Sequence, residues 1–455
     1  MSNEKFERIP VGIDDVCVHI PKLFIDVTGE FAQSRGIEPA KLTKGIGIER
    51  MSVPDAHEDA ATMGAMSLLK LLQKNNIEPK HVGKIYIGTE SGVDESKAIG
   101  TYILGMMERV YGQGSFEECA TVEFKFACIG TTHALENVSY WVNALHPNDP
   151  RVGIVIASDI AKYDLNSPGE YTQGAGSVAM LVKKNPRILA FEPNIGVFTK
   201  NENDFYRPIG ESTAVVHGKH SNACYMAAMK SALTSYERKA IRRGVITLKN
   251  GECLSDHISH MIFHIPYPRM AEYASAFIFK HEWRELPRWK VIEKEIGKEP
   301  QQDMFEDYDE FIVADHQYRR KFSKTQQFLD AFKSKVVAST MLSRQIGNIY
   351  TGSLYLGLMS LLEPDCKLMP GQRVGFGSYG SGCEAIVFSG IVPEGISTRT
   401  KTDIWKQLDQ RKEITVADYE RLHEGDSVES VIPPRNEFAL TGFDKYAYRQ
   451  YDYIK

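Results

Sequence analysis

Residues 122–135 read VEFKFACIGTTHAL, and they carry the strongest structural signal in the chain. An apolar, strand-like approach leads to Cys128, and a helical pattern then opens at Gly-Thr-Thr and continues to Trp141. A cysteine at such a corner lies near the N–H groups of a helix N-terminus, where the dipole favours the thiolate and the donors can hold an oxyanion. The stretch therefore predicts either a nucleophile that attacks a thioester or a buried apolar cysteine, the commonest fate of a free thiol.

The composition is that of an ordinary globular protein. The 455 residues, 42% hydrophobic and 25% charged, suffice for two or more domain-sized units with buried cores. A formal net charge of −5 does not favour nucleic acid or an anionic membrane surface as a partner, and no apolar run is long enough to cross a bilayer. The start of the chain lacks an apolar signal core. The seven cysteines are scattered and odd in number, which argues against a disulfide framework and predicts a cytoplasmic location.

The first part of the chain, residues 1–190, alternates short β-type runs with helical patterns. Buried strands are predicted at 84–88, 152–157 and 176–182, and an amphipathic helix at 60–72. Apolar strands with intervening helices indicate an α/β sheet that is covered on both faces.

A connection at 185–208, rich in Pro, Asn and Asp, joins the first part to a second part, residues 191–455. Residues 283–335 differ from the rest because they are dense in charged and aromatic residues with weak periodicity. We interpret them as an inserted helical or partly mobile surface element, and ordinary solvated helices are preferred to a specific binding module. The other predicted elements are a helix at 225–238, a strand at 261–265, and strands at 373–377 and 385–389 paired around a glycine-rich turn.

Glu90 is the first further candidate for chemistry, because it follows the predicted strand 84–88. A carboxyl group at the C-terminal end of a buried strand commonly faces a cleft, and desolvation raises its pKa towards the range useful for acid–base catalysis. The alternative is a solvated loop glutamate.

His264 leaves an apolar strand at residues 263–265 and is either a satisfied core histidine or a group that polarises a substrate carbonyl. His257, His260 and His264 do not predict a metal site, because the pattern changes from helix-like to strand-like between them and no cysteine pair supports them. Asn348, before a helical pattern, either caps that helix or donates to a substrate oxygen. The turn 377–382 does not match a dinucleotide-binding fingerprint, but its N–H groups could approach a reacting carbonyl.

Together these segments resemble the hydroxymethylglutaryl-CoA synthases of the thiolase superfamily. The most specific matching stretches are 158–166, 170–176 and 348–355, and 204–208 and 376–382 also fit. The resemblance implies a thiolase-like five-layer α-β-α-β-α sandwich of two similar halves, 1–190 and 191–455, the second with the insertion at about 283–335. It also implies a homodimer with the active site between the halves.

The resemblance assigns a role to each matching position. Cys128 corresponds to the acetylated nucleophile, Glu90 to the general acid/base and His264 to the histidine that orients acetoacetyl-CoA. Arg269 stands where the family usually has a lysine near the CoA phosphates. The other expected substrate-binding residues are Asn348, Ser378 (in the turn that lines the active centre), Thr172 and Tyr350.

The implied reaction condenses acetyl-CoA with acetoacetyl-CoA through acetyl-Cys128 and gives 3-hydroxy-3-methylglutaryl-CoA and CoA, as in the mevalonate pathway. Neither a metal nor another cofactor is expected, since the CoA thioesters are substrates. A carrier-protein-dependent condensing enzyme of polyketide β-branching and a non-catalytic scaffold are the alternatives. The insertion and residues 217–221, HGKHS, depart from the family, which typically has an Asp-Gly pair at the latter position. The insertion suggests an interface with an acyl-CoA-supplying protein such as a thiolase.

Overall fold

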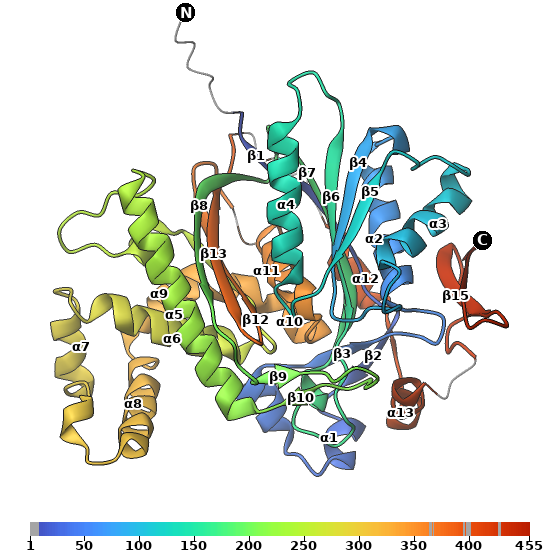
Figure 1. The fold of residues 1–455 in the computed structure, drawn as a ribbon. Helices are drawn as coiled ribbons and strands as arrows, with labels where there is room; N and C mark the ends of the chain where they lie inside the picture. Colours follow the sequence, from blue (N-terminus) through green and yellow to red (C-terminus); the bar gives the residue numbers. More distant parts are fainter. Residues whose placement is uncertain (1–8, 364–365, 367, 395, 397–401, 426–428) are drawn as a thin grey trace, which may run out of the picture.

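The computed structural model describes residues 9–363, 366, 368–394, 396, 402–425 and 429–455. Its main feature is a mixed sheet of nine strands in the order β11-β12-β13-β8-β1-β7-β6-β4-β5 (Figure 1). The three strands predicted in the first part are confirmed as β4, β6 and β7. The bounds are β1 (Val11–His19), β4 (Val82–Gly88), β5 (Ala120–Phe124), β6 (Val152–Ile160), β7 (Ala175–Lys184), β8 (Leu189–Thr199), β11 (His260–Phe263), β12 (Arg373–Gly380) and β13 (Glu384–Ile391).

The sheet consists of two halves with the same topology. The order β1-β7-β6-β4 in one half corresponds to β8-β13-β12-β11 in the other, and β5 extends the first half at its edge. The halves join through two residue pairs between β1 and β8, Gly12 with Ala190 and Ile13 with Leu189. A Cβ atom on Gly12 would lie 1.8 Å from the carbonyl oxygen of Leu189, so this close approach requires glycine.

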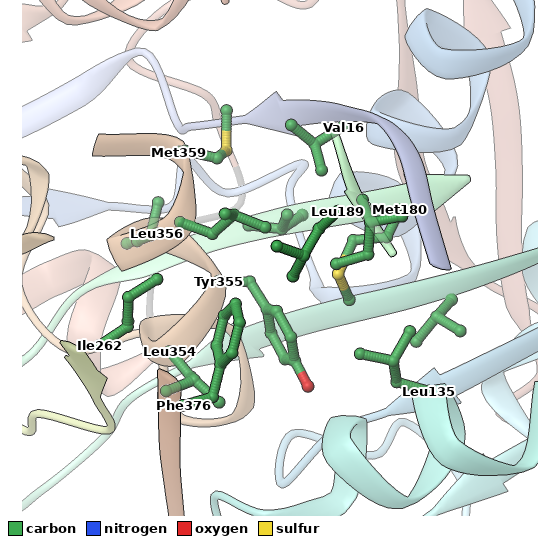
Figure 2. Packing of buried hydrophobic residues seen from close by; sticks show 14 of the residues in the cluster. Val16, Leu135, Met180, Leu189, Ile262, Leu354, Tyr355, Leu356, Met359 and Phe376 are labelled. Carbon is green, nitrogen blue, oxygen red and sulfur yellow. The ribbon is translucent and has the colours of Figure 1, made fainter. Parts of the chain in front are cut away.

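Helices complete five layers around these strands, which confirms the predicted sandwich. Helices α2 and α3 cover the outer face of the first half, and α5 covers that of the second, where α6 contacts α5 and shares its apolar core. Helices α4 and α11 lie between the two halves and share one apolar core with strands of both (Figures 1 and 2). The bounds are α2 (Ala60–Asn75), α3 (Ile99–Tyr111), α4 (Gly130–Ala144), α5 (Gly218–Arg242), α6 (Arg269–Trp283) and α11 (Ser353–Leu361).

Smaller elements surround this framework. In the described part of the chain, no helix is both long and apolar enough to span a membrane. The remaining elements are β2 (Leu23–Asp26), α1 (Glu30–Ser34), η1 (Lys41–Ile46), β3 (Arg50–Val53), η2 (Pro79–His81), η3 (Glu170–Thr172), β9 (Phe205–Tyr206), β10 (Val215–Val216), η4 (Leu254–His257), η6 (Val337–Thr340), α10 (Met341–Ile346), η7 (Tyr350–Gly352), α12 (Ile404–Asp409), β14 (Lys412–Glu413), α13 (Val416–Glu424), β15 (Glu437–Phe443) and β16 (Arg449–Ile454).

Two sequence predictions in the second half are wrong. The segment 185–208 is not only a connection, because β8 and β9 lie within it. The polar residues that obscured β8 include Asn194, which is buried and donates to the backbone of Tyr236 at 3.0 Å. The glycine-rich turn is also shorter than predicted, since β12 continues to Gly380 and places Ser378 in a strand.

The insertion is helical, as predicted, but it is not a set of simple solvated helices. It contains α7 (Trp289–Ile296), η5 (Gln302–Met304), α8 (Tyr308–Phe322) and α9 (Gln326–Lys335), and α7 and α8 lie on the side of the molecule opposite α2 and α3 (Figure 1). Its inner faces bury Trp289, Phe322 and Phe328 against Phe279 and Trp283 of α6. These rings are in direct contact, with centroids 5.3 Å apart for Phe322 and Phe328 and 5.7 Å apart for Trp283 and Phe322.

Candidate active site

Cys128 lies at the predicted corner between β5 and α4. The chain reaches it through Ala127, which has a φ of 40°, and α4 begins two residues later at Gly130. A Cβ atom on Gly88, at the end of β4, would lie 2.2 Å from the backbone nitrogen of Thr131. The first turn of α4 therefore packs directly on the end of β4, and this contact brings the loop after β4 next to the cysteine.

Glu90 is the partner of Cys128. The Sγ–H group of Cys128 donates to Oε1 of Glu90 at 2.7 Å. Burial, followed by the charge of Asp159, raises the pKa of Glu90 to about 8. Burial and the carboxylate of Glu90 also raise the pKa of Cys128 well above its usual value. Desolvation and the neighbouring carboxylate therefore oppose the thiolate, which the helix N-terminus was predicted to favour.

Asp159 was not singled out from the sequence, although it holds this centre together. Its buried carboxylate accepts hydrogen bonds from the backbone N–H of Glu90 at 2.7 Å, and from the N–H and hydroxyl of Thr351 at 3.1 and 2.5 Å. Burial raises its pKa to about 6, and the hydrogen bonds limit the rise. A carboxylate at the end of the apolar strand β6 was the available signal. It links the Glu90 loop to the second half of the chain.

A cavity of about 540 Å³ opens beside Glu90. Its lining includes Tyr350 and charged residues of both signs, among them Lys125 and Lys162. Arg207 also lines the cavity and donates to the backbone carbonyl of Glu90. The positive charge of Arg207 partly offsets the rise in the pKa of the Glu90 carboxyl group. The cavity gives a polar molecule access to the loop that carries the carboxyl group.

His264 directly follows β11 in the second half. Its backbone N–H donates to the carbonyl of Gly377 at 2.8 Å, and its own carbonyl accepts from the hydroxyl of Tyr225 at 2.9 Å. The side chain is buried, and Nδ1 has no hydrogen-bond partner among the described residues. Burial lowers the pKa of His264 to about 4, so the imidazole is neutral near neutral pH. A neutral ring with an unpaired buried nitrogen suits the binding of a polar substrate group.

Asn348 is held in a fixed orientation before α11. Its backbone N–H donates to the carbonyl of Thr172 at 2.9 Å. Its side-chain oxygen accepts from the N–H of Tyr350 at 2.9 Å and from the hydroxyl of Ser353 at 2.8 Å. These bonds close a local turn and do not cap a helix, since the N-cap residues of η7 and α11 are Ile349 and Gly352 and neither helix has a side-chain cap hydrogen bond. The NH₂ group is the donor end of the Asn348 side chain.

Ser378 connects β12 of the second half to the helix that follows Cys128. Its hydroxyl lies 2.7 Å from that of Thr132, which lies 3.0 Å from the hydroxyl of Tyr355. The backbone N–H of His264 donates to the carbonyl of Gly377, which precedes Ser378 in β12. Strand β12 therefore links the end of β11 to the first turn of α4. Sequence positions from both halves thus meet around one centre.

The remaining expected residues occupy different surroundings. Tyr350 is buried, and its ring contacts Tyr163 and Phe205 in a small apolar cluster against Cys128. The hydroxyl of Thr172 donates to the carbonyl of Gly169 at 2.7 Å. Arg269 lies apart at the start of α6, where its guanidinium group pairs with Glu272 at 2.7 Å and its side chain is 42% exposed.

Comparison with known proteins identifies what this arrangement resembles. Family models for the N-terminal and C-terminal parts of hydroxymethylglutaryl-coenzyme A synthase match residues 8–186 and 189–429. A hydroxymethylglutaryl-CoA synthase of Haloferax volcanii is 35% identical over 455 residues, with 98% of this chain and 99% of the relative covered. One of Enterococcus faecalis is 33% identical over 413 residues, covering 90% and 91% of the two chains.

Solved structures agree with the sequence comparison. MvaS in complex with 3-hydroxy-3-methylglutaryl coenzyme A has a TM-score of 0.83 at 29% identity and covers 98% of this chain and 100% of its own. The HMG synthase of the curacin biosynthetic pathway has a TM-score of 0.78 at 20% identity, with 98% of this chain and 100% of that one covered. At that identity the likeness establishes the fold alone.

Proposed function

Because this chain belongs to the hydroxymethylglutaryl-CoA synthase family, which makes it an acyltransferase, we propose specific roles for its residues in the condensation of acetyl-CoA with acetoacetyl-CoA. The products are 3-hydroxy-3-methylglutaryl-CoA and CoA. The observation that carries the assignment is the hydrogen bond from the Cys128 thiol to Glu90.

Acetylation of Cys128 is the first step. Sγ attacks the carbonyl carbon of acetyl-CoA while Glu90 accepts the thiol proton, and the tetrahedral intermediate then expels CoA, which takes a proton as it leaves. The N–H groups at the start of α4 are the proposed donors to the oxyanion. The raised pKa of Glu90, about 8, fits a group that both accepts and returns a proton near neutral pH.

Condensation follows in the same site. Glu90 removes a proton from the acetyl methyl group, and the resulting carbon nucleophile attacks the ketone of acetoacetyl-CoA. His264 and Asn348 are proposed to donate hydrogen bonds to the ketone oxygen as it gains charge, and the proton that Glu90 took from the methyl group is returned to this oxygen to give the hydroxyl group. Water then hydrolyses the thioester to Cys128 and frees the product. These steps move acyl groups and protons, and they require no electron acceptor.

Substrate binding is assigned to the surrounding residues. Ser378, Thr172 and Tyr350 are proposed to shape the acyl site, and the burial of Ser378 and Tyr350 next to the Cys128 loop supports this. Arg269 is proposed to meet CoA phosphate, which its exposed guanidinium group permits. Its pairing with Glu272 would have to yield to the phosphate.

CoA is the proposed acyl carrier. Relatives of 35% and 33% identity are named hydroxymethylglutaryl-CoA synthases, whereas the curacin synthase solved with a donor carrier protein is only 20% identical. The presence of Cys128, Glu90 and His264 argues against a non-catalytic scaffold.

We further propose a cytoplasmic homodimer that works in the mevalonate pathway and receives acyl-CoA from a protein such as a thiolase. The edge strand β5 supports self-association, because Val122 on it is 41% exposed and one side of the strand is unpaired within the described sheet.

The acyl-enzyme provides the decisive test. Incubation with acetyl-CoA alone is expected to add one acetyl group, which peptide mass spectrometry maps to Cys128. Cys128→Ala should remain unlabelled, and Cys128→Ser should turn over very poorly because a neutral hydroxyl is the weaker nucleophile. Addition of acetoacetyl-CoA to the acetylated parent should then give 3-hydroxy-3-methylglutaryl-CoA. Unchanged labelling of Cys128→Ala would contradict the assignment.

A further inference from the structure

Three chemically different side chains converge outside the acylation site, where the β8–β9 loop meets α5. Glu202 comes from the loop, and His220 and Cys224 lie one turn apart near the start of α5. Across the described ranges, this is the only group of three or more His, Cys, Asp or Glu residues whose ligand atoms all lie within 4.8 Å of one another.

Two of the three separations in this cluster match the edges of a metal-centred tetrahedron, and the third, between Glu202 and Cys224, is within 4.8 Å. Nε2 of His220 is 3.3 Å from Oε2 of Glu202 and 3.5 Å from Sγ of Cys224. Zinc bonds of about 2.3 Å to sulfur and about 2.0–2.1 Å to nitrogen or oxygen give tetrahedral edges of about 3.3 Å and about 3.6 Å. One cation can therefore contact the histidine and both of its neighbours with little movement.

The surroundings favour entry of a cation. Lys200 pairs with Oε1 of Glu202, so the other oxygen, Oε2, faces the histidine. Cys224 is buried, whereas the side chain of His220 is 51% exposed, which gives an ion access from solvent. Asp204 lies close enough to Cys224 for its charge to act on the thiol, so the local field also attracts a cation.

The thiol of Cys224 must lose its proton when a cation binds. Burial raises the pKa of Cys224 to about 11, and Asp204, Glu202 and Cys383 add to this rise while Lys200 opposes it. Near neutral pH, formation of the metal–sulfur bond therefore breaks the S–H bond and releases the proton to solvent.

We propose that Glu202, His220 and Cys224 bind a divalent cation of the zinc class, with water completing its coordination. The ion would fasten the β8–β9 loop to α5, beside Asp204, which already accepts hydrogen bonds from Ser221 and the N–H of Gly382. The loop continues into residues that line the cavity next to Glu90, so the ion stabilises one wall of that cavity without entering the chemistry. His220 belongs to the segment 217–221, which departs from the family pattern.

Titration of the full-length chain with Co²⁺, after removal of metal by a chelator, tests the proposal. One Co²⁺ per chain should bind, with a thiolate-to-cobalt absorption band and the intense visible bands of four-coordination, and Zn²⁺ should displace it. Cys224→Ser should abolish the thiolate band, and Glu202→Gln should weaken Zn²⁺ binding at least about tenfold. Cys253→Ser, which removes a buried thiol outside the cluster, and His217→Ala, which removes a histidine just before α5, should bind as the parent does.

Glu202→Gln is the decisive variant if Cys224→Ser fails to fold, because Glu202 is on a loop. Zn²⁺ should raise the melting temperature of the parent but not that of Glu202→Gln. The absence of stoichiometric Co²⁺ binding by the parent overturns the proposal, as does parent-like affinity of folded Glu202→Gln.

Discussion

At the scale of the residue, Cys128 and Glu90 share a hydrogen bond in surroundings that disfavour a charge on either group. The resting pair is therefore a thiol with a neighbouring acid of raised pKa. Proton transfer must accompany attack, because a free thiolate would be both desolvated and next to a carboxylate. Asp159 strengthens this coupling, since its own buried charge is among the causes of the raised pKa of Glu90.

The first residue-scale prediction concerns pH. Only ionised Glu90 can accept the thiol proton, and its pKa of about 8 means that this form grows as the pH rises through that value. Acetylation of Cys128 should therefore accelerate with rising pH and level off above it. Glu90→Gln should lose this dependence and slow condensation by about 10²–10⁴-fold. Rapid-quench measurement of acetyl-Cys128 across the pH range checks the first effect, and product formation after addition of acetoacetyl-CoA checks the second. A pH profile of Glu90→Gln parallel to that of the parent would contradict the role.

The second residue-scale prediction concerns His264. Burial lowers the pKa of His264 to about 4, so the imidazole is neutral near neutral pH. The pH profile of the condensation rate should therefore show no inflection from His264 near the usual histidine pKa. His264→Ala should impair use of acetoacetyl-CoA more than acetylation by acetyl-CoA. Separate assays of the two half-reactions make the comparison, and equal losses would remove His264 from the second-substrate site.

At the scale of the element, helices α7, α8 and α9 are part of the folded core of the second half. Their aromatic side chains cover α6, and Lys280 of α6 forms buried ion pairs with Glu299 at 2.5 Å and Asp315 at 2.6 Å. Replacement of the whole insertion by a flexible linker would expose Phe279 and Trp283 and leave Lys280 unpaired. Point substitutions therefore test the insertion better than its removal.

Two positions in these helices form a matched pair. Phe328 is fully buried, so Phe328→Ala should lower the free energy of unfolding by about 3–5 kcal/mol. Ile312 on α8 is 43% exposed, and Ile312→Ala should change the free energy of unfolding by less than about 0.5 kcal/mol. Urea denaturation measures both. Equal, small effects would mean that the insertion is the solvated surface element that its composition suggested.

The sequence predicted those elements and site residues whose signal is local. Continuous apolar runs identify β4, β6 and β7, and the strand-cysteine-helix pattern locates Cys128. Asp159 could not be assigned a role in this way, because its partners Glu90 and Thr351 are distant in the sequence. The packing of Phe328 on α6 could not be predicted either, but for another reason. Charged residues on the outer faces of the helices mask the stripe of buried residues in the sequence pattern.

At the scale of the whole molecule, the two half-sheets meet where Gly12 contacts the backbone of Leu189. In the described sheet, two residue pairs join β1 and β8 at this seam, and the apolar core around α4 and α11 includes residues from both sides of it (Figure 2). The seam thus sets the relative position of the halves that supply Cys128 and His264.

A methyl group at the seam should therefore have a long-range effect. Gly12→Ala places Cβ 1.8 Å from a carbonyl oxygen, so the strands must separate, and the free energy of unfolding should fall by about 1–3 kcal/mol. Gly105→Ala, inside α3 where an added Cβ has no atom within 4 Å, is the control and should not lower the free energy of unfolding. Denaturant titrations compare them, and an unaffected Gly12→Ala would show that the seam accommodates a side chain.

The matching topology of the halves places the proposed site residues at equivalent positions. Glu90 follows β4 and His264 follows the equivalent strand β11, while Cys128 precedes α4 and Asn348 precedes the equivalent helix α11. The two halves thus share one layout, and the proposed roles differ between them, with the nucleophile and base in the first half and the neutral donors in the second. With one pair of these groups in each half, a substitution at any of the four positions should disable a step that the groups of the other half do not perform.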